Sequence, residues 1–207
     1  MNNLKFKWLV FFIFLMSSTP FVVSAQENRE IIWNFTRSDT GYFFNGSFKL
    51  IADPACVLNL CFEYDHIRAL APDAQAVTLE DMGPCWNRIA YVYRKYYIFR
   101  NKSLWNRVLD TTRKRVDFTL LSSINNLSVM PVMISSSGYY KVSSRNDTTT
   151  VEYYQQCRLR GAPLTSFYMK KAEEEALHFM QRFYEYAVAH CGHIVLSDIH
   201  DQQTANE

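Results

Sequence analysis

Glycine and proline are scarce, with six of each in 207 residues. This scarcity excludes collagen-like and low-complexity chains, which depend on repeated glycine or proline. Charged residues make up only 20% of the sequence and hydrophobic residues 48%, which excludes a disordered chain. The length predicts about one folded domain.

The short motifs of common catalytic sites are also missing. The sequence has no Walker-type phosphate loop, H-E-x-x-H metal motif, G-x-S-x-G elbow or G-x-G-x-x-G fingerprint. Glu63, Asp65 and His66 could form an acid/base group, but a solvated strand edge is the simpler interpretation. Residues 190–193 (His-Cys-Gly-His) resemble a fragment of a zinc site without a second ligand cluster. We therefore expect no enzyme, no metal and no cofactor, and rank a histidine-based hydrolase lowest.

Only one apolar run suggests targeting. Lys5 and Lys7 precede an apolar stretch over 8–16, and a segment of small residues ends at Ala25. This pattern predicts a secretory signal peptide over 1–25 and hence secretion. The apolar stretch is far below the ~18 residues of a membrane span. We expect no span after cleavage.

Cleavage would leave a neutral chain. Lys and Arg total 22 and Asp and Glu total 20, and the leader contains two of the lysines. Nucleic-acid binding normally requires a positive excess, so no nucleic-acid partner is expected. The one basic run, 113–115, is interpreted as a solvated turn. A single domain over 26–200 and a polar tail over 201–207 remain.

Glycan acceptors and cysteines agree with export. Each used acceptor must face solvent, because the attached sugar is bulky and hydrated. Cysteines in an oxidising compartment should pair, and an odd number leaves one free or bonded to another chain. We expect Cys157 to pair with Cys191, and Cys85 to pair with Cys56 or Cys61. The five N-x-S/T acceptors are Asn34, Asn45, Asn101, Asn126 and Asn146.

Most of the mature chain is patterned as strands. Residues 41–51 alternate between apolar and polar side chains, which predicts a half-buried strand with Asn45 on its polar face. Similar patterns predict strands over 86–99 and 116–120 and a hairpin over 138–157. A short apolar run over 57–64 is interpreted as a strand, and 67–84 as a loop with at most one helical turn.

The spacing of apolar residues changes near the C-terminus. Apolar residues recur every three or four positions from Met169 to Tyr186, which predicts an amphipathic helix over 165–190. Thr165 or Ser166 could cap its start, and Gly192 could take the left-handed position at its end. Residues 194–199 are interpreted as a last short strand.

About seven or eight strands followed by one helix predict a mainly β fold. We expect an antiparallel meander that closes into a barrel, with the C-terminal helix on one flank. A barrel of this size can hold one small ligand. Aromatic residues reach 15% of the sequence and could line such a site. The candidate ligand-binding residues are Tyr93, Tyr97, Phe118 and Tyr153.

The final third resembles a known family. A late strand over 149–160 that carries Cys157 precedes the helix, and Cys191 and a short apolar segment follow it. This order resembles the salivary lipocalins of ticks. The resemblance implies a lipocalin-like β-barrel that sequesters a small amine, lipid or similar mediator.

The main functional hypothesis is therefore a secreted glycoprotein carrier for a small amphipathic or hydrophobic ligand. The alternative is a cytokine-like or immune-modulating factor that binds an extracellular protein. The glycan acceptors, the odd cysteine and the helix are compatible with that second hypothesis. A contiguous exposed apolar patch over a filled interior would favour it.

Overall fold

The computed structural model describes residues 31–95 and 99–192. In this part of the chain a single eight-stranded antiparallel sheet packs against one long helix. The elements in chain order are β1 (Ile32–Ser38), β2 (Gly41–Leu50), α2 (Pro54–Leu60), α3 (Tyr64–Leu70), β3 (Ala76–Gly83), β4 (Trp86–Lys95), β5 (Phe99–Asp110), β6 (Arg115–Asn125), β7 (Val132–Arg145), β8 (Thr148–Arg160) and α4 (Thr165–Cys191).

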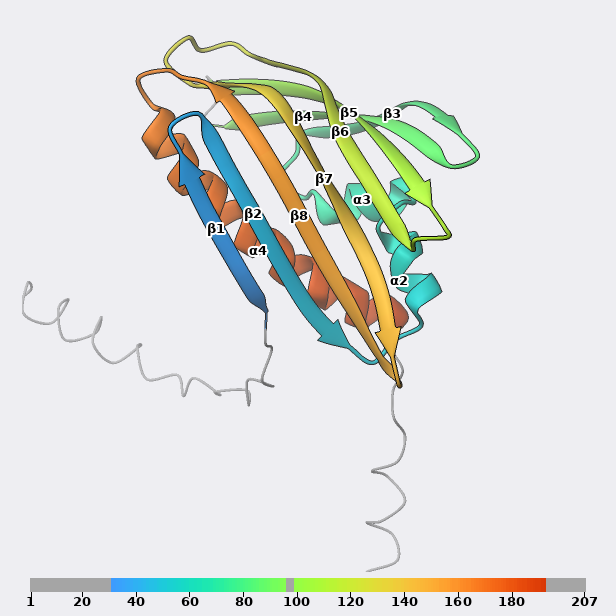
Figure 1. The fold of residues 1–207 in the computed structure, drawn as a ribbon. Coiled ribbons are helices and arrows are strands. Elements are labelled where there is room, and N and C mark those ends of the chain that lie inside the picture. Colours follow the sequence, from blue (N-terminus) through green and yellow to red (C-terminus); the bar gives the residue numbers. More distant parts are fainter. Residues whose placement is uncertain (1–30, 96–98, 193–207) are drawn as a thin grey trace, which may run out of the picture.

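The predicted closed barrel is wrong, because the sheet is open. Its strand order is β1-β2-β8-β7-β6-β5-β4-β3, and β1 and β3 form the two edges. The connection from β2 to β3 crosses from one side of the sheet to the other through α2 and α3. The two edge strands do not pair with each other, so the eight strands do not close. Figure 1 shows α4 lying behind β1, β2 and β8, across one face of the curved sheet.

The strand predicted over 57–64 is also wrong, since this segment is helical. Asp53 accepts a hydrogen bond from the Ala55 backbone N–H at 3.0 Å, and Pro54 occupies the first helical turn. The buried side chains of α2 then follow helical spacing, at Val57, Leu58 and Leu60. The predicted loop over 67–84 contains most of α3 and all of the edge strand β3.

The helix predicted over 165–190 is confirmed, although its ends differ from the expectation. Leu164 precedes the first helical residue, and no side chain caps the helix N-terminus. The Thr165 hydroxyl bonds instead with the backbone of Ala162. Gly192 has a φ of −64°, so it does not take the left-handed conformation. The segment predicted as a strand over 194–199 lies outside the described residues.

The main core lies between α4 and the face of the sheet that it covers, called the inner face below. The alternation predicted for β2 is confirmed, because Phe44 and Phe48 are buried and Asn45 is exposed. Met180 and Phe183 of α4 pack against this surface, and the rings of Phe48 and Phe183 meet edge to face at 5.4 Å. The buried inner-face side chains include Val116, Phe118, Val142, Val151 and Tyr153.

One disulfide closes the fold, and it differs from the predicted pairing. Cys56 of α2 is bonded to Cys191 at the end of α4, while Cys61, Cys85 and Cys157 are free. Cys157 instead packs near Met169, close to the start of α4. A helix rises about 1.5 Å per residue, so the 22 residues from Met169 to Cys191 separate these positions by roughly 33 Å.

The packing of the core predicts that two phenylalanines of α4 contribute very differently to the stability of the protein. Phe183→Ala is expected to lower the free energy of unfolding by about 3–5 kcal/mol, because it removes a ring that is fully buried. Phe167→Ala is the matched control, since Phe167 is 55% exposed, and should change stability by less than about 0.5 kcal/mol. Urea denaturation of both variants checks this. Equal losses would contradict the packing described.

Candidate functional site

The inner face carries a cluster of aromatic side chains under α4. The rings of Phe118 and Tyr153 stack with centroids 5.7 Å apart, and Tyr140 lies 4.9 Å from Tyr153. From α4, the Phe179 ring lies 5.4 Å from Tyr153, and the Phe183 ring lies 5.9 Å from Tyr140. Strand alternation on β6, β7 and β8 directs the three sheet residues to one side. These five residues are called the aromatic cluster.

A glycine makes room for the cluster. Gly138 of β7 lies opposite Phe118 in the strand register. A Cβ atom at this position would come within 2.5 Å of the Phe118 ring. The Phe118 ring can therefore lie over the β7 backbone only because this position has no side chain.

The inner face is not uniformly filled. Tyr93 of β4 pairs in register with Asn101, and its side chain stacks at 6.2 Å on Tyr91. Tyr93 nevertheless remains 37% exposed. Trp105 and Tyr140, also on the inner face, are only partly buried. These side chains are therefore not fully covered by α4.

A pocket of about 430 Å³ lies at the corner where α3 passes into β3. Its lining includes Arg68 of α3 and Val77 of β3. Val77 pairs in register with Tyr91 of β4, and its carbonyl accepts a hydrogen bond from the Tyr64 hydroxyl at 2.7 Å. The pocket therefore borders the part of β3 that pairs with Tyr91.

A buried arginine connects the sheet to the small helices. Arg107 of β5 is 4% exposed, and its guanidinium donates to the backbone carbonyls of Cys61 and Phe62. It also lies 5.8 Å from the centre of the Tyr140 ring. Burial raises the pKa of the Tyr140 and Tyr153 hydroxyls, and the nearby Arg107 charge only partly opposes this. The phenols therefore stay neutral at physiological pH.

The predicted ligand-binding residues are partly brought together. Phe118 and Tyr153 are in contact within the aromatic cluster, and Tyr93 lies farther along the same face. Tyr97 lies outside the described residues. Their role in ligand binding stays a prediction. Sequence reasoning missed Tyr140 and Phe179, although the alternation of β7 and the spacing of α4 both place them inward.

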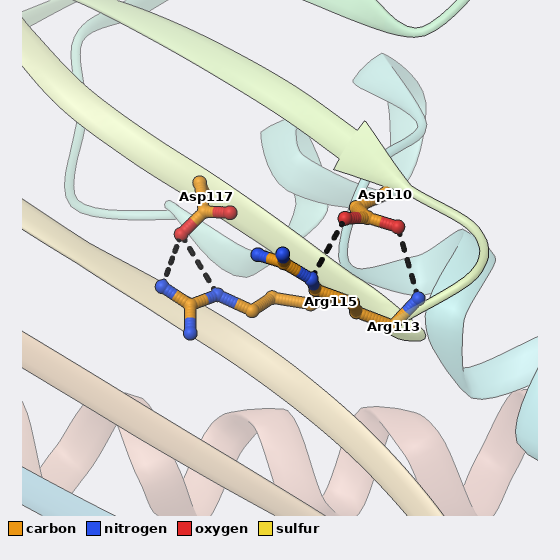
Figure 2. A network of polar contacts seen from close by, with 4 residues as sticks. All are labelled: Asp110, Arg113, Arg115 and Asp117. Atoms are coloured by element: carbon orange, nitrogen blue, oxygen red, sulfur yellow. Dashed lines mark hydrogen bonds and ion pairs between the residues drawn. The ribbon is translucent and has the colours of Figure 1, made fainter.

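The outer face carries compensated charges. Figure 2 shows Arg115 bonded to Asp117, and Arg113 paired with Asp110 at 3.6 Å across the β5–β6 turn. Arg113 and Lys114 of the basic run lie in the turn, as predicted, while Arg115 begins β6. Both arginines have acidic partners. The Arg115 guanidinium also lies 4.0 Å from the centre of the Tyr139 ring. Asp117 faces away from the inner face.

The histidine groups have structural partners. His66 Nδ1 lies 2.9 Å from the Tyr186 hydroxyl, and His190 Nδ1 lies 2.8 Å from the Tyr186 carbonyl oxygen. Cys191 is held in the disulfide, which removes its thiolate as a metal ligand. Over 31–95 and 99–192, no group of three His, Cys, Asp or Glu side chains is placed to hold a metal. His193 lies outside these ranges.

The predicted glycan acceptors differ in exposure. Asn34, Asn45, Asn126 and Asn146 are exposed. Asn101 is only 9% exposed, on the inner face. An attached sugar at Asn101 would have to project from the inner face, which sets this acceptor apart from the other four. No described helix has both the length and the apolar character needed to span a membrane.

Comparison by sequence finds no matching protein family and no matching curated protein. Comparison of the structure finds similar folds. The protein TTHA0849 from Thermus thermophilus is 12% identical with a TM-score of 0.57, and the match covers 70% of this chain and 96% of that chain. A START superfamily protein from Mycobacterium smegmatis is 8% identical with a TM-score of 0.54, covering 71% and 97%.

The Zhui aromatase/cyclase from Streptomyces sp. R1128 is 11% identical with a TM-score of 0.55, covering 76% of this chain and 95% of that chain. These likenesses show the fold alone, in which a curved open sheet packs against a long C-terminal helix, as in a helix-grip fold. The resemblance to tick lipocalins is not supported by them. The expectation that the chain is not an enzyme is corrected, because this fold also includes aromatase/cyclases.

The reactivity of the three free thiols tests the burial described for the sheet and helices. Burial raises the pKa of Cys61 to about 12 and that of Cys157 to about 11, so both are protonated at pH 8. Cys85 is exposed. A thiol reagent such as DTNB should label one cysteine rapidly in the native protein and two more only after unfolding. Cys85→Ser should abolish the rapid phase.

Raising the pH toward 11 should speed labelling of the two buried thiols, because their thiolate fractions grow only there. Rapid labelling of all three thiols at pH 8 would contradict the burial described.

Proposed function

We propose that the protein binds a small hydrophobic or amphipathic molecule between the inner face and α4. The observation that supports this most is the aromatic cluster, which lies under the helix beside partly exposed inner-face side chains. Apolar and aromatic linings with a few polar groups are typical of small-molecule sites. Ligand binding is common to carriers and enzymes, and the same site would serve either.

The position of the site in the fold supports the same proposal. The sheet supplies a rigid concave wall, and α4 covers it along the β1, β2 and β8 side (Figure 1). The opposite side, toward β4 and β5, is where Tyr93 remains exposed. A ligand would enter from that side and place its apolar body against Phe118 and Tyr153. Burial of apolar area contributes about 25 cal/mol per Å².

Filling the space tests the proposal. Leu120 pairs with Trp105 on the inner face, whereas the adjacent Leu121 is exposed. Leu120→Trp should weaken binding of the neutral probe N-phenyl-1-naphthylamine at least about tenfold, because the added ring would occupy the ligand volume. Leu121→Trp is the matched control and should bind as the unaltered protein does. Probe fluorescence at constant protein concentration measures both affinities.

Saturable binding to one site per chain is expected in the unaltered protein. Absence of any saturable binding, or equal affinities in the two tryptophan variants, would contradict a site on the inner face.

We also propose that the chain is exported and glycosylated. The basic and apolar leader over 1–25, the disulfide Cys56–Cys191 and the exposed acceptors support this. Protein secreted by eukaryotic cells should begin at Gln26. Glycopeptide mapping should find sugars only among the exposed acceptors and none at Asn101. Retention of the leader, or a glycan on Asn101, would contradict this proposal.

A further inference from the structure

The inner face has a polar end beyond the aromatic cluster. Two rows of paired residues cross β4, β5 and β6 there: Tyr91 pairs with Ser103, which pairs with Ser123, and Tyr93 pairs with Asn101. Residues paired in register share a face of the sheet, so all five side chains point to the inner side. These five residues are called the polar patch.

Two atoms of the polar patch are buried without a partner. Neither Asn101 Oδ1 nor Ser123 Oγ has a hydrogen bond to any described residue. The Asn101 side chain is more than nine-tenths buried, and an unsatisfied buried polar group costs about 1–3 kcal/mol. Asn125 is the register partner of Asn101 on β6 and is used differently, because its amide N–H donates to the Pro131 carbonyl and its oxygen accepts from the Leu127 N–H. A structural role accounts for Asn125 but not for Asn101.

The polar patch is continuous with the aromatic cluster. The Trp105 indole N–H donates to Ser103 Oγ at 3.0 Å, and the same indole meets the Phe118 ring edge to face at 5.9 Å. One small molecule could therefore contact both groups. Tyr93 is the exposed member of the patch, and Tyr91 pairs in register with Val77, which borders the pocket.

The polar patch favours an uncharged partner. Its members are two phenols, two hydroxyls and one amide, and desolvation raises the pKa of Tyr91 and Tyr93 so that both phenols stay protonated. At the rim, Arg182 of α4 is offset by Asp73 at 3.6 Å. Burying an unpaired charge there would cost far more than burying a hydrogen-bonded neutral group.

From this arrangement we infer that the polar patch binds the hydroxyl head group of an uncharged amphipathic ligand. The ligand hydroxyl donates to Asn101 Oδ1 and accepts from the Ser123 hydroxyl, while its apolar body lies on Trp105 and Phe118. This inference rests on the proposed ligand-binding function and adds the chemical class of the ligand.

The test compares two probes that differ in one hydrogen-bond donor. 2-Naphthol carries a hydroxyl donor, and 2-methoxynaphthalene keeps the oxygen and the rings but has no donor. Calorimetric titration of the whole exported chain should give tighter binding of 2-naphthol, by about tenfold, as expected for one buried hydrogen bond that the analogue leaves unmade.

The preference should depend on the polar patch. Asn101→Leu should reduce the affinity ratio between the two probes to about one, with little loss of affinity for 2-methoxynaphthalene. Ser123→Ala should reduce the ratio partially, and it tests the inference even if the Asn101 variant does not fold. The matched controls are Asn106→Leu on the outer side of β5 and Ser122→Ala, which is exposed on β6. Both should keep the original ratio.

The outcomes separate the two proposals. If neither probe binds the unaltered protein, the proposed ligand-binding function fails and the inference fails with it. If both probes bind with equal affinity, or if Asn101→Leu and Ser123→Ala keep the original ratio, the hydroxyl site is wrong while ligand binding stands.

Discussion

The structure depends on the packing of one long amphipathic helix against one face of a curved, open sheet. Phe183 and Met180 are fully buried there, and Phe183 meets Phe48 and Tyr140. An open sheet with one covered face needs such a helix, because its apolar face would otherwise remain in water. The disulfide Cys56–Cys191 fixes the far end of the helix to α2. This arrangement covers one side of the inner face and leaves the other accessible.

Because α4 covers only one side of the inner face, that side is filled by packed side chains and the other side is partly exposed. Near β2 the helix lies directly on the sheet, and Met180 and Phe183 pack against Phe48 in the core. Toward β4 and β5, Tyr93 remains exposed and Trp105 is only partly buried. Unsatisfied atoms of Asn101 and Ser123 lie in that second region. Buried polar atoms of folded proteins are normally hydrogen-bonded, and these two unsatisfied atoms are the basis of the proposed hydroxyl site.

Local patterns in the sequence predicted most strands and the long helix correctly, but they wrongly predicted that the sheet closes into a barrel. The alternation around Phe44 and the three- and four-residue spacing through Phe183 both gave the correct element and the correct buried side. The segment from Val57 to Leu60 failed, because a short apolar run has no clear period and the capping signal of Asp53 and Pro54 was overlooked. Eight strands form even so, and the sheet stays open because its two edge strands, β1 and β3, do not pair with each other, which no local pattern indicates.

The candidate site was also predicted only in part, because local patterns show which side chains point inward but not which strands are neighbours. Phe118 and Tyr153 could be placed inward from strand alternation, but the contacts across β7 and α4 depend on strand order. Strand order is a long-range property that periodicity does not contain. The disulfide is a similar case, since spacing along the chain gave no reason to join Cys56 to Cys191.

The most direct test of the account is to locate a bound molecule by NMR. Intermolecular NOEs between 2-naphthol and the protein should connect the ligand ring to the side chains of Phe118 and Tyr153, on the inner face. NOEs confined to Tyr139 and Tyr154, which stack on the outer face, would place the ligand outside the fold and contradict the account.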